Sequence, residues 1–559
     1  MKDISILVAG KAGDGIRQAG ILIAKLLDQL GYWIFLYDDY PSLISGGHNF
    51  SIIRANQKKI LAHQNEVDFV IAFNEDAIKN HRARITKNTV VFYDSEVVKK
   101  TKGYGIPVTK IVREAGLPMI VRNTVNLGIF AGALGLDFEI VEKVIRQSLN
   151  KKIDENIKVA KIGYQESKKL NLGIKIKKIN NPAKKLLTGN DTTALGAVEA
   201  GMKLFIAYPM TPASNILHYL ATNQKELGIK TAHVENEIAA GLMIQGAAYT
   251  GTRTMTSTSG GGFALMVEGV SLAGQTEIPS VFVLSQRPGP GTGVPTYTTQ
   301  GDLFFALYSG HGEFLKILLA PGDADEAFYL AGKAMNLAWQ YQTPVILLLD
   351  KHLSESTYSV DYDPKKVKII KEKKWTGKGT YQRYQQTKDG VSPLAYPGNK
   401  NAIVKVASYE HDQTGISTEE PELIAAMIDK RLRKRNTLIT EMKLAKNKKR
   451  IVNVYGKKNS KTVLITWGST KGAVVEVAEK LSLKVVQPLF LEPLPDWQIK
   501  KELVGAKMVI DIEVNATAQL ATLLKQHGIK VNKKILKYDG RPFAVDELES
   551  LVKKIINKK

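Results

Sequence analysis

The sequence predicts an α/β protein made of several doubly wound domains, and three observations favour this class. Apolar runs of strand length alternate with longer helical patterns along most of the chain, an order typical of parallel sheets covered by helices. The 559 residues are too many for one hydrophobic core and indicate about three to four domains. Hydrophobic residues make up 44% of the chain and only 20 residues are proline, so we expect it to be folded throughout.

The first domain is expected over residues 1–175. Strand patterns lie at 4–10, 33–39, 67–73 and 89–94, and a helical pattern lies at 16–31. This alternation predicts a doubly wound parallel sheet. The turn from Gly10 to Gly15 lacks the third glycine of a dinucleotide fingerprint and the Gly-Lys-Ser/Thr ending of a P-loop. The stretch from Ser45 to Arg54, with a glycine pair beside His48, is compatible with phosphate or coenzyme A binding and also with an ordinary turn.

A second α/β domain is expected over residues 191–362, after a linker. Residues 176–190 are charged, contain Asn-Asn-Pro and lack periodicity, which is typical of a linker. Between Leu204 and Asp302, strand patterns and small-residue helices carry polar groups only at their junctions. Open α/β sheets bind ligands at the carboxyl ends of their strands, so this stretch is the predicted location of a site.

The first candidate in this stretch is Thr211. Residues 204–207 form a predicted strand, and Thr211-Pro212 has the form of a helix N-cap followed by proline at the first helical position. A helix is therefore expected to begin there. Its free amide groups would favour a bound anion, and the Thr211 hydroxyl would add a donor. The alternative is that Thr211 only caps the helix.

The second candidate is Glu237, which opens a predicted helix whose later residues are almost all alanine, glycine or large apolar residues. Burying a carboxylate without a partner costs several kcal/mol, so a buried Glu237 needs a hydrogen-bonding partner. A nitrogen heterocycle that shares a proton with the carboxylate would be one such partner. The alternative is that Glu237 occupies a solvated first turn, where an acid suits the helix dipole.

Two further strand ends carry candidates. Ser259 and Gly260 follow the strand pattern at 253–258 and open a triple glycine, which indicates either close approach of backbone amides to a ligand or a bare turn. Arg287 stands at the carboxyl end of the strand pattern at 280–286, where its planar guanidinium would match a carboxylate. A structural salt bridge to Glu277 or Asp302 is the competing account.

The remaining chain comprises a basic insert or connection at 363–450 and another α/β domain at 451–559. The insert ends in a helical pattern with one strongly basic face, which is either solvated or a docking surface for a partner. The whole chain has 78 basic and 54 acidic residues and a net charge of +24. Because its lysines are dispersed and lack interleaved aromatic residues, we expect a solvated basic surface rather than nucleic-acid binding.

Cysteine and histidine usage restricts the chemistry of the chain. With no cysteine, it offers no disulfide, no thiolate nucleophile and no conventional ligand for an iron–sulfur cluster. Its nine histidines show no metal-binding spacing, so we predict no metal site within the chain.

No apolar run reaches the length of a membrane span, and the first residues indicate a strand rather than a signal peptide, so a cytoplasmic protein is expected.

Four motifs together carry a resemblance to a known family. They are YPMTPAS (208–214), ENEIAAG (235–241), TSTSGGG (256–262) and SQRPGPGTG (285–293), the last followed by Gln300-Gly301-Asp302. This ordered set resembles the α subunit of the 2-oxoacid:ferredoxin oxidoreductases, in the form fused to a γ subunit. The resemblance covers nearly the whole chain. It assigns 1–175 to a γ-type domain, 191–362 to a pyrimidine-binding-type domain and 451–559 to a transketolase carboxyl-terminal-like domain.

The resemblance implies a thiamine-diphosphate enzyme that oxidatively decarboxylates a 2-oxoacid to acyl-CoA and passes electrons to ferredoxin. By match, Glu237 contacts N1′ of the cofactor aminopyrimidine, Ser259 and Gly260 lie beside the cofactor, and Thr211 and Arg287 hold the substrate carboxylate. The family's diphosphate motif is absent, because Gly13-Asp-Gly15 lacks a properly spaced asparagine pair.

Mg²⁺, the diphosphate contacts and the iron–sulfur cluster are therefore expected in a partner β subunit. We accordingly expect a hetero-oligomer that is active only with that subunit and uses coenzyme A as co-substrate. 2-Oxoglutarate is the favoured substrate, with pyruvate or a broad range of 2-oxoacids as alternatives. A non-catalytic scaffold or assembly subunit is the alternative of another class.

Overall fold

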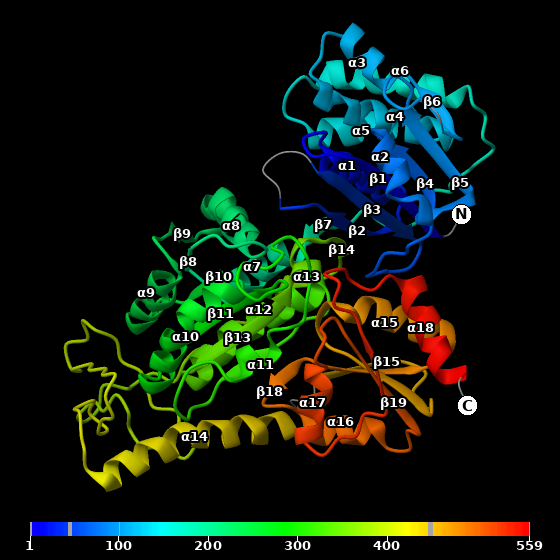
Figure 1. Ribbon diagram of the computed structural model, residues 1–559. Helices are drawn as coiled ribbons and strands as arrows, with labels where there is room; N and C mark the ends of the chain where they lie inside the picture. Colours follow the sequence, from blue (N-terminus) through cyan, green and yellow to red (C-terminus); the bar gives the residue numbers. More distant parts are fainter. Residues whose placement is uncertain (1–2, 43–46, 100, 445–450, 558–559) are drawn as a thin grey trace. The chain divides into compact units, whose positions relative to one another are not determined.

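The computed structural model describes residues 3–42, 47–99, 101–444 and 451–557. The chain divides into two compact units, and each contains residues that are far apart in the sequence (Figure 1). The first unit comprises Met1–Leu187, Glu355–Asp361 and Phe543–Lys559, and the second comprises Thr188–Ser354 and Tyr362–Pro542. Both units contain sheets covered by helices, so the predicted α/β class is confirmed.

The first unit is built on an eight-stranded mixed sheet with the order β6-β5-β4-β1-β3-β2-β14-β7. Its strands are β1 (Asp3–Lys11), β2 (Trp33–Asp39), β3 (His48–Asn56), β4 (Val67–Ala72), β5 (Ile85–Asp94), β6 (Tyr104–Ile106), β7 (Lys185–Thr188) and β14 (Thr357–Val360). β1, β4, β5 and β6 are parallel, whereas β3 is antiparallel to β1 and β2. The prediction of a parallel sheet is wrong for β2, and β3 is not among the predicted strands. Residues 40–47 are too few for the crossover of about a dozen residues that parallel neighbours need, so β2 and β3 are antiparallel.

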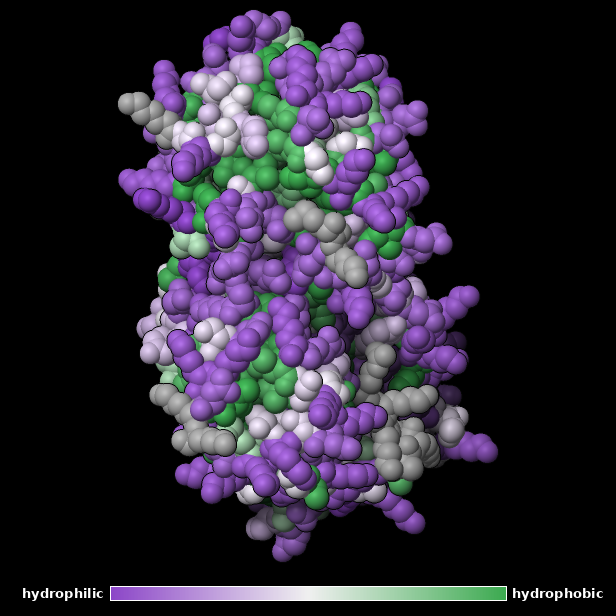
Figure 2. Space-filling view, turned by 90° about the vertical axis from the view of Figure 1, so that its right-hand side faces the viewer, coloured by the Kyte–Doolittle hydropathy of each residue, from purple (hydrophilic) through white to green (hydrophobic). Residues whose placement is uncertain are grey.

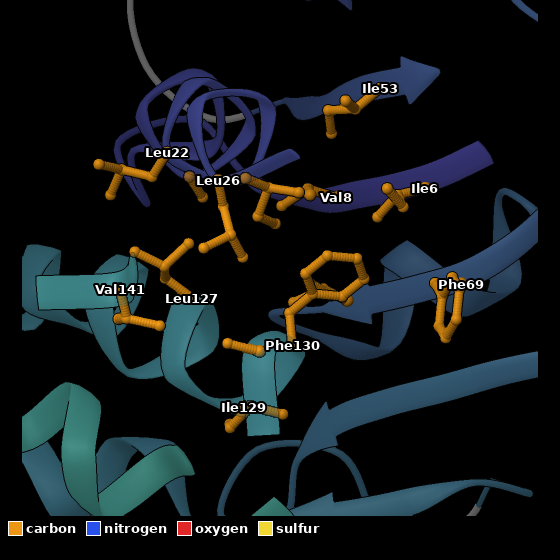
Figure 3. Packing of buried hydrophobic residues seen from close by; sticks show 14 of the residues in the cluster. Ile6, Val8, Leu22, Leu26, Ile53, Phe69, Leu127, Ile129, Phe130 and Val141 are labelled. Atoms are coloured by element: carbon orange, nitrogen blue, oxygen red, sulfur yellow. The ribbon is translucent and has the colours of Figure 1, made fainter. Parts of the chain in front are cut away.

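Helices cover one face of this sheet through a continuous hydrophobic core. The helices of the unit are α1 (Ile16–Gln29), α2 (Glu75–Lys79), η1 (Arg82–Arg84), α3 (Val108–Glu114), η2 (Met119–Val121), α4 (Arg122–Ala133), α5 (Phe138–Ser148), α6 (Ile153–Lys168) and α18 (Val545–Asn557). Figure 3 shows Val8 of β1 and Phe130 of α4 within this core. The Phe130 ring meets that of Phe69 edge to face, with centroids 5.4 Å apart. α4 and α6 approach so closely that a Cβ added to Gly128 would lie 1.9 Å from the Ala160 carbonyl oxygen.

The first unit takes three of its elements from outside the first expected domain. The segment 176–190, expected to be a linker, contains β7, which forms an edge of the sheet beside β14. β14 comes from the end of the segment expected to form the second domain, and α18 comes from the end of the chain. Strands and helices that join a unit from distant parts of the chain carry no local sequence signal of the unit they join.

The second unit contains a seven-stranded sheet with the order β18-β12-β13-β11-β10-β8-β9. Its strands are β8 (Leu204–Ala207), β9 (Lys230–His233), β10 (Thr254–Thr258), β11 (Ser280–Gln286), β12 (Ile317–Leu319), β13 (Pro344–Asp350) and β18 (Phe490–Glu492). All neighbours are parallel except β18, which runs antiparallel to β12. Every residue of β10, β11 and β13 is buried, as expected for parallel strands covered on both faces.

A second, five-stranded sheet of this unit has the order β15-β17-β16-β19-β20. Its strands are β15 (Val452–Gly456), β16 (Thr462–Ile465), β17 (Lys484–Pro488), β19 (Met508–Glu513) and β20 (Lys533–Leu536). The helices of the unit are α7 (Gly189–Glu199), α8 (Ser214–Leu227), α9 (Glu237–Tyr249), α10 (Gly260–Gln275), α11 (Leu303–Leu307), α12 (Ala324–Tyr341), α13 (Lys351–Glu355), η3 (Pro364–Lys366), α14 (Pro421–Lys443), η5 (Gly468–Thr470), α15 (Lys471–Leu481), α16 (Asp496–Leu503) and α17 (Gln519–Gln526).

The basic helix α14 is anchored by ion pairs that the sequence did not reveal. Lys430 and Lys434 are buried and both pair with the buried Glu277, at 2.7 and 2.5 Å. Arg431 pairs with Glu410 at 2.5 Å. The expectation of a basic face that is solvated or docks a partner is therefore wrong for these three residues, because their charges hold α14 against its own unit.

Glu410 belongs to a short motif, Ser-Tyr-Glu-His-Asp-Gln-Thr-Gly (408–415), whose chemistry the sequence leaves open. The Asp412 carboxylate accepts hydrogen bonds from the amides of Thr414 and Ile416 and so closes a tight turn. The His411 ring packs edge to face on Tyr384, with centroids 3.6 Å apart. The motif thus forms a turn that contacts α14 through the ion pair of Glu410 with Arg431.

Hydrophilic side chains dominate the face of the molecule shown in Figure 2, with patches of hydrophobic residues between them. This distribution agrees with the dispersed lysines of the sequence. Across the described ranges, no helix combines the length and the hydropathy needed to cross a membrane.

Candidate cofactor and substrate site

The candidate site lies at the carboxyl edge of the seven-stranded sheet. β8, β10 and β11 are parallel neighbours in this sheet, so the segments that follow them emerge at the same edge. Thr211 follows β8, Ser259 and Gly260 follow β10, and Arg287 follows β11. The topology thus brings together residues that are up to 76 positions apart in the sequence.

Thr211 and Arg287 are in direct contact. The Arg287 Nη1 donates a hydrogen bond of 2.7 Å to the Thr211 carbonyl oxygen, and burial lowers the pKa of the guanidinium. In the described part of the chain, Arg287 has no ion pair with Glu277 or Asp302, since Glu277 is held by Lys430 and Lys434. The competing account of Arg287 as a structural salt bridge is therefore wrong.

The predicted helix start at Thr211 is also wrong, because α8 begins at Ser214. The carbonyl of a helix N-cap accepts the first helical hydrogen bond. Here the amides of Ala213 and Ser214 both bond to the Met210 carbonyl, while the Thr211 carbonyl is taken by Arg287. Thr211 therefore lies in the turn between β8 and α8, where the Arg287 side chain fixes its main chain.

Glu237 is the first residue of α9 and is buried, with 4% of its surface exposed. The Asn236 side chain caps the helix by accepting a hydrogen bond from the Ala239 amide. The Glu237 Oε1 atom has no hydrogen-bond partner in the described structure. A buried carboxylate oxygen without a partner is costly, so this atom marks a place where a donor from outside the chain is expected.

The carboxyl group of Glu237 packs against the start of α10. A Cβ added to Gly262 would lie 2.6 Å from Glu237 Oε1 and 2.1 Å from Thr258 Oγ1, so only glycine fits there. Thr258 Oγ1 in turn contacts the Met210 sulfur at 3.8 Å, next to Thr211. This series of contacts joins Glu237 to the turn that carries Thr211.

Ser259 and Gly260 lie beside a second buried acid, Asp302. Ser259 precedes α10, and its hydroxyl has no partner in the described structure. A Cβ added to Gly260 would lie 3.0 Å from Asp302 Oδ2, which is likewise buried without a partner. Burial raises the pKa of Asp302 to about 6. In the sequence, Asp302 stands out only as a competing salt-bridge partner of Arg287 and as the end of the fourth motif, because an acid after Gln-Gly has no pattern that predicts burial.

Next to this edge, α9 and α10 present large apolar side chains to solvent. Ile238, Leu242 and Met243 of α9 and Leu265 of α10 are each 42% to 50% exposed. The two helices pack on each other at the edge of the second unit (Figure 1). A group of exposed apolar residues of this kind is typical of a surface that a partner covers.

The candidates in the first unit behave differently. Arg54 is buried and donates two hydrogen bonds to Asp3. Its guanidinium is therefore paired inside the unit and is not accessible to a phosphate. His48 and His81 share a hydrogen bond of 2.8 Å between their Nε2 atoms, and burial lowers the pKa of His81 to about 3. Ser45 and Gly46 lie outside the described residues.

Comparisons with known proteins give one consistent result. Residues 195–430 match the family model described as pyruvate flavodoxin/ferredoxin oxidoreductase, thiamine diphosphate-binding, and residues 5–166 match pyruvate ferredoxin/flavodoxin oxidoreductase. The 2-oxoacid:ferredoxin oxidoreductase subunit alpha of Saccharolobus solfataricus is 33% identical, over 99% of this chain and 98% of that protein.

Two further matches carry a more specific name. The 2-oxoglutarate synthase subunit KorA of Methanocaldococcus jannaschii is 32% identical, over 59% of this chain and 88% of that protein. The solved 2-oxoglutarate:ferredoxin oxidoreductase of Magnetococcus marinus, with 2-oxoglutarate, coenzyme A and succinyl-CoA bound, is 31% identical with a TM-score of 0.90. That match covers 100% of both chains.

Proposed function

Because this chain belongs to the 2-oxoacid:ferredoxin oxidoreductases, in which it corresponds to the α subunit, we propose that Glu237, Thr211 and Arg287 form its half of a shared catalytic site. The observation that carries the proposal is the buried Glu237 Oε1 without a partner, near the turn where Arg287 holds Thr211. A scaffold that does no chemistry has no use for an unsatisfied buried carboxylate, which only costs stability.

The residues at this edge fit thiamine diphosphate. When bound, this cofactor supplies a nucleophilic carbon and an electron sink for decarboxylation. Glu237 would hold its aminopyrimidine nitrogen N1′ and share a proton with it. Gly262 leaves room for the Glu237 carboxylate itself, and Gly260, which opens α10, would let the main chain approach the cofactor. The Ser259 hydroxyl, which has no partner in the described structure, offers a further hydrogen bond.

Arg287 and Thr211 would bind the substrate carboxylate. The Arg287 Nη1 donates a hydrogen bond to the Thr211 carbonyl oxygen. The other N–H groups of the planar guanidinium remain available to bind an anion. The partly buried guanidinium is poorly hydrated, which strengthens its attraction for a carboxylate. Holding the substrate in a fixed orientation removes part of the entropic barrier, and such positioning supplies several kcal/mol.

A partner β subunit would complete the site. This chain has no cysteine, so the iron–sulfur cluster that passes electrons to ferredoxin would lie in the partner, together with Mg²⁺ and the contacts to the diphosphate. The exposed apolar residues of α9 and α10 support docking of that subunit beside Glu237. The resulting hetero-oligomer would release CO₂, transfer the acyl group to coenzyme A and reduce ferredoxin.

We favour 2-oxoglutarate as the substrate. The KorA subunits and the Magnetococcus marinus enzyme, both similar to this chain, carry that substrate in their names. Use of pyruvate or of a broad range of 2-oxoacids is the alternative, because other relatives that match nearly the whole chain are named only for 2-oxoacids. Comparing kcat/KM for a panel of 2-oxoacids distinguishes the two.

The test uses the chain co-expressed with a β-type partner that carries Gly-Asp-Gly and four cysteines. Glu237→Gln should lower oxoacid-dependent dye reduction at least about 100-fold, because the proton shared with N1′ is lost. The matched control is Glu235→Gln, since Glu235 is exposed two residues earlier and should leave activity unchanged. Normal turnover by the Glu237 variant would contradict its assignment.

The same experiment tests the scaffold alternative. If the wild-type complex assembles with its cofactors but reduces no dye with any 2-oxoacid, the chain has an architectural role. If it reduces dye and only the Glu237 variant fails, the catalytic role is supported.

A further inference from the structure

The second unit contains a cavity that none of the candidate site residues lines. Its volume is about 920 Å³, within the range of about 300 to 1,000 Å³ typical of small-molecule sites. One wall is a face of α12, and the others are the segment 366–370, the end of α14 and the residues around β18. Figure 1 labels α12, α14 and β18 within the second unit.

Apolar side chains make most of the wall. They are Leu330 and Leu337 from α12, Leu438 and Met442 from α14, and Phe490 from β18. All five are buried, with at most 8% of their surface exposed. A ligand that fills this cavity must therefore have an apolar body.

One cation, Lys333, lies within this apolar wall without an anionic partner. In the described part of the chain its ammonium group makes no hydrogen bond and no ion pair. It makes a cation–π contact with Phe490, with the nitrogen 4.6 Å from the ring centroid. Burial lowers the pKa of Lys333 to about 8. A partly buried ammonium that only an aromatic face stabilises is poorly compensated, because cation–π contact replaces a fraction of its hydration.

The other charged residues at the cavity are either paired or at its rim. Glu326 pairs with the buried Lys471 at 2.6 Å, and Glu441 accepts a hydrogen bond of 2.7 Å from the Tyr341 hydroxyl. Lys366 and Lys368 are exposed. Two carboxylates near the wall disfavour a highly charged ligand, whereas the single inner ammonium suits one negative charge.

We propose that this cavity is a binding site for an organic monocarboxylate with an apolar body, whose carboxylate pairs with Lys333 while its chain packs on Leu330, Leu337 and Phe490. This site is independent of the proposed catalytic function and shares no residue with it.

The test is a calorimetric titration of the purified complex. Octanoate is the probe, and 1-octanol is its neutral analogue. Octanoate should bind at least about tenfold more tightly than octanol, because only octanoate forms a charge-assisted hydrogen bond. Lys333→Met, which keeps the apolar stem, should weaken octanoate binding about 10- to 100-fold. Lys333→Arg should restore much of it.

Two controls separate this site from non-specific binding. Lys365→Met removes an exposed lysine that does not line the cavity and should change octanoate binding by less than about twofold. Leu337→Trp should block binding by filling the cavity, with the melting temperature measured to check the fold. The proposal is overturned if octanoate does not bind at millimolar concentration, if octanol binds equally well, or if Lys333→Met binds octanoate like the wild type.

Discussion

Gly262 offers a direct test of the Glu237 assignment without changing the acid itself. In Gly262→Ala, the new Cβ would lie 2.6 Å from Glu237 Oε1 and 2.8 Å from Glu237 Cγ, whereas ordinary contact begins at 3.4 Å. The carboxylate must therefore retreat by about 0.8 Å, unless α10 shifts by the same distance. Thr258 Oγ1, at 2.1 Å from that Cβ, must also turn away.

A displacement of this size is large for a catalytic contact. Misplacing a catalytic group by about 1 Å costs about 100-fold in rate, so kcat/KM for the 2-oxoacid should fall by about that factor. The fold should survive, because alanine gains up to about 1 kcal/mol over glycine in a helix, which offsets part of the overpacking cost of about 1 to 3 kcal/mol.

The measurements are dye reduction by the complex with its β subunit and calorimetric binding of thiamine diphosphate. Gly246→Ala is the matched control, since its added Cβ meets nothing within 4 Å on α9; it should leave both quantities unchanged. If Gly262→Ala binds the cofactor and turns over within about threefold of the wild type, the Glu237 carboxylate does not need its present position and its assignment to N1′ is wrong.

Three further predictions concern other charged groups. Arg287→Lys should raise KM for the 2-oxoacid about tenfold, because lysine lacks the planar fork that holds a carboxylate; an unchanged KM in steady-state assays would show that the carboxylate binds elsewhere. Glu277→Gln should lower the free energy of unfolding by about 3 to 5 kcal/mol in urea denaturation, because it leaves the ammonium groups of Lys430 and Lys434 buried without an anion; a loss below about 1 kcal/mol would contradict this. Burial, and then a neighbouring carboxylate, raise the pKa of Asp511 well above its usual range, so the native state holds this proton more tightly than the unfolded state and stability falls as pH rises above about 4. Asp511→Asn should therefore gain stability over the wild type progressively from pH 5 to pH 8, and a difference that does not vary with pH would count against it.

Much of the candidate site could be predicted because parallel sheets follow a simple geometric rule. Strands that are predicted to be parallel neighbours end at one edge, so residues after β8, β10 and β11 were expected together, and the contact between Thr211 and Arg287 agrees. The small residues of its helix left Glu237 either buried or in a solvated first turn, and the structure shows it buried. These inferences need only strand order and residue size.

Other features depend on partners that are distant in the sequence. The lysines of α14 have the spacing of a solvated face, and only the fold shows that Glu277, 153 residues away from Lys430, pairs with them. Thr211 has the local form of a cap, but a side chain 76 residues later takes its carbonyl. Secondary-structure propensity depends only on neighbouring residues, so it cannot account for a side chain from a distant part of the sequence that pairs with these groups.

The first unit is built from three separate segments of the chain, which affects how it folds during synthesis. Its sheet includes β14, and its surface includes α18, where the Asp546 carboxylate accepts hydrogen bonds from the amides of Asn65 and Glu66. A nascent chain that has emerged only as far as residue 187 therefore lacks an interior strand of its first sheet, between β2 and β7, and these amide contacts. Domains generally fold as units during translation, so this unit cannot reach its native form until α18 has left the ribosome.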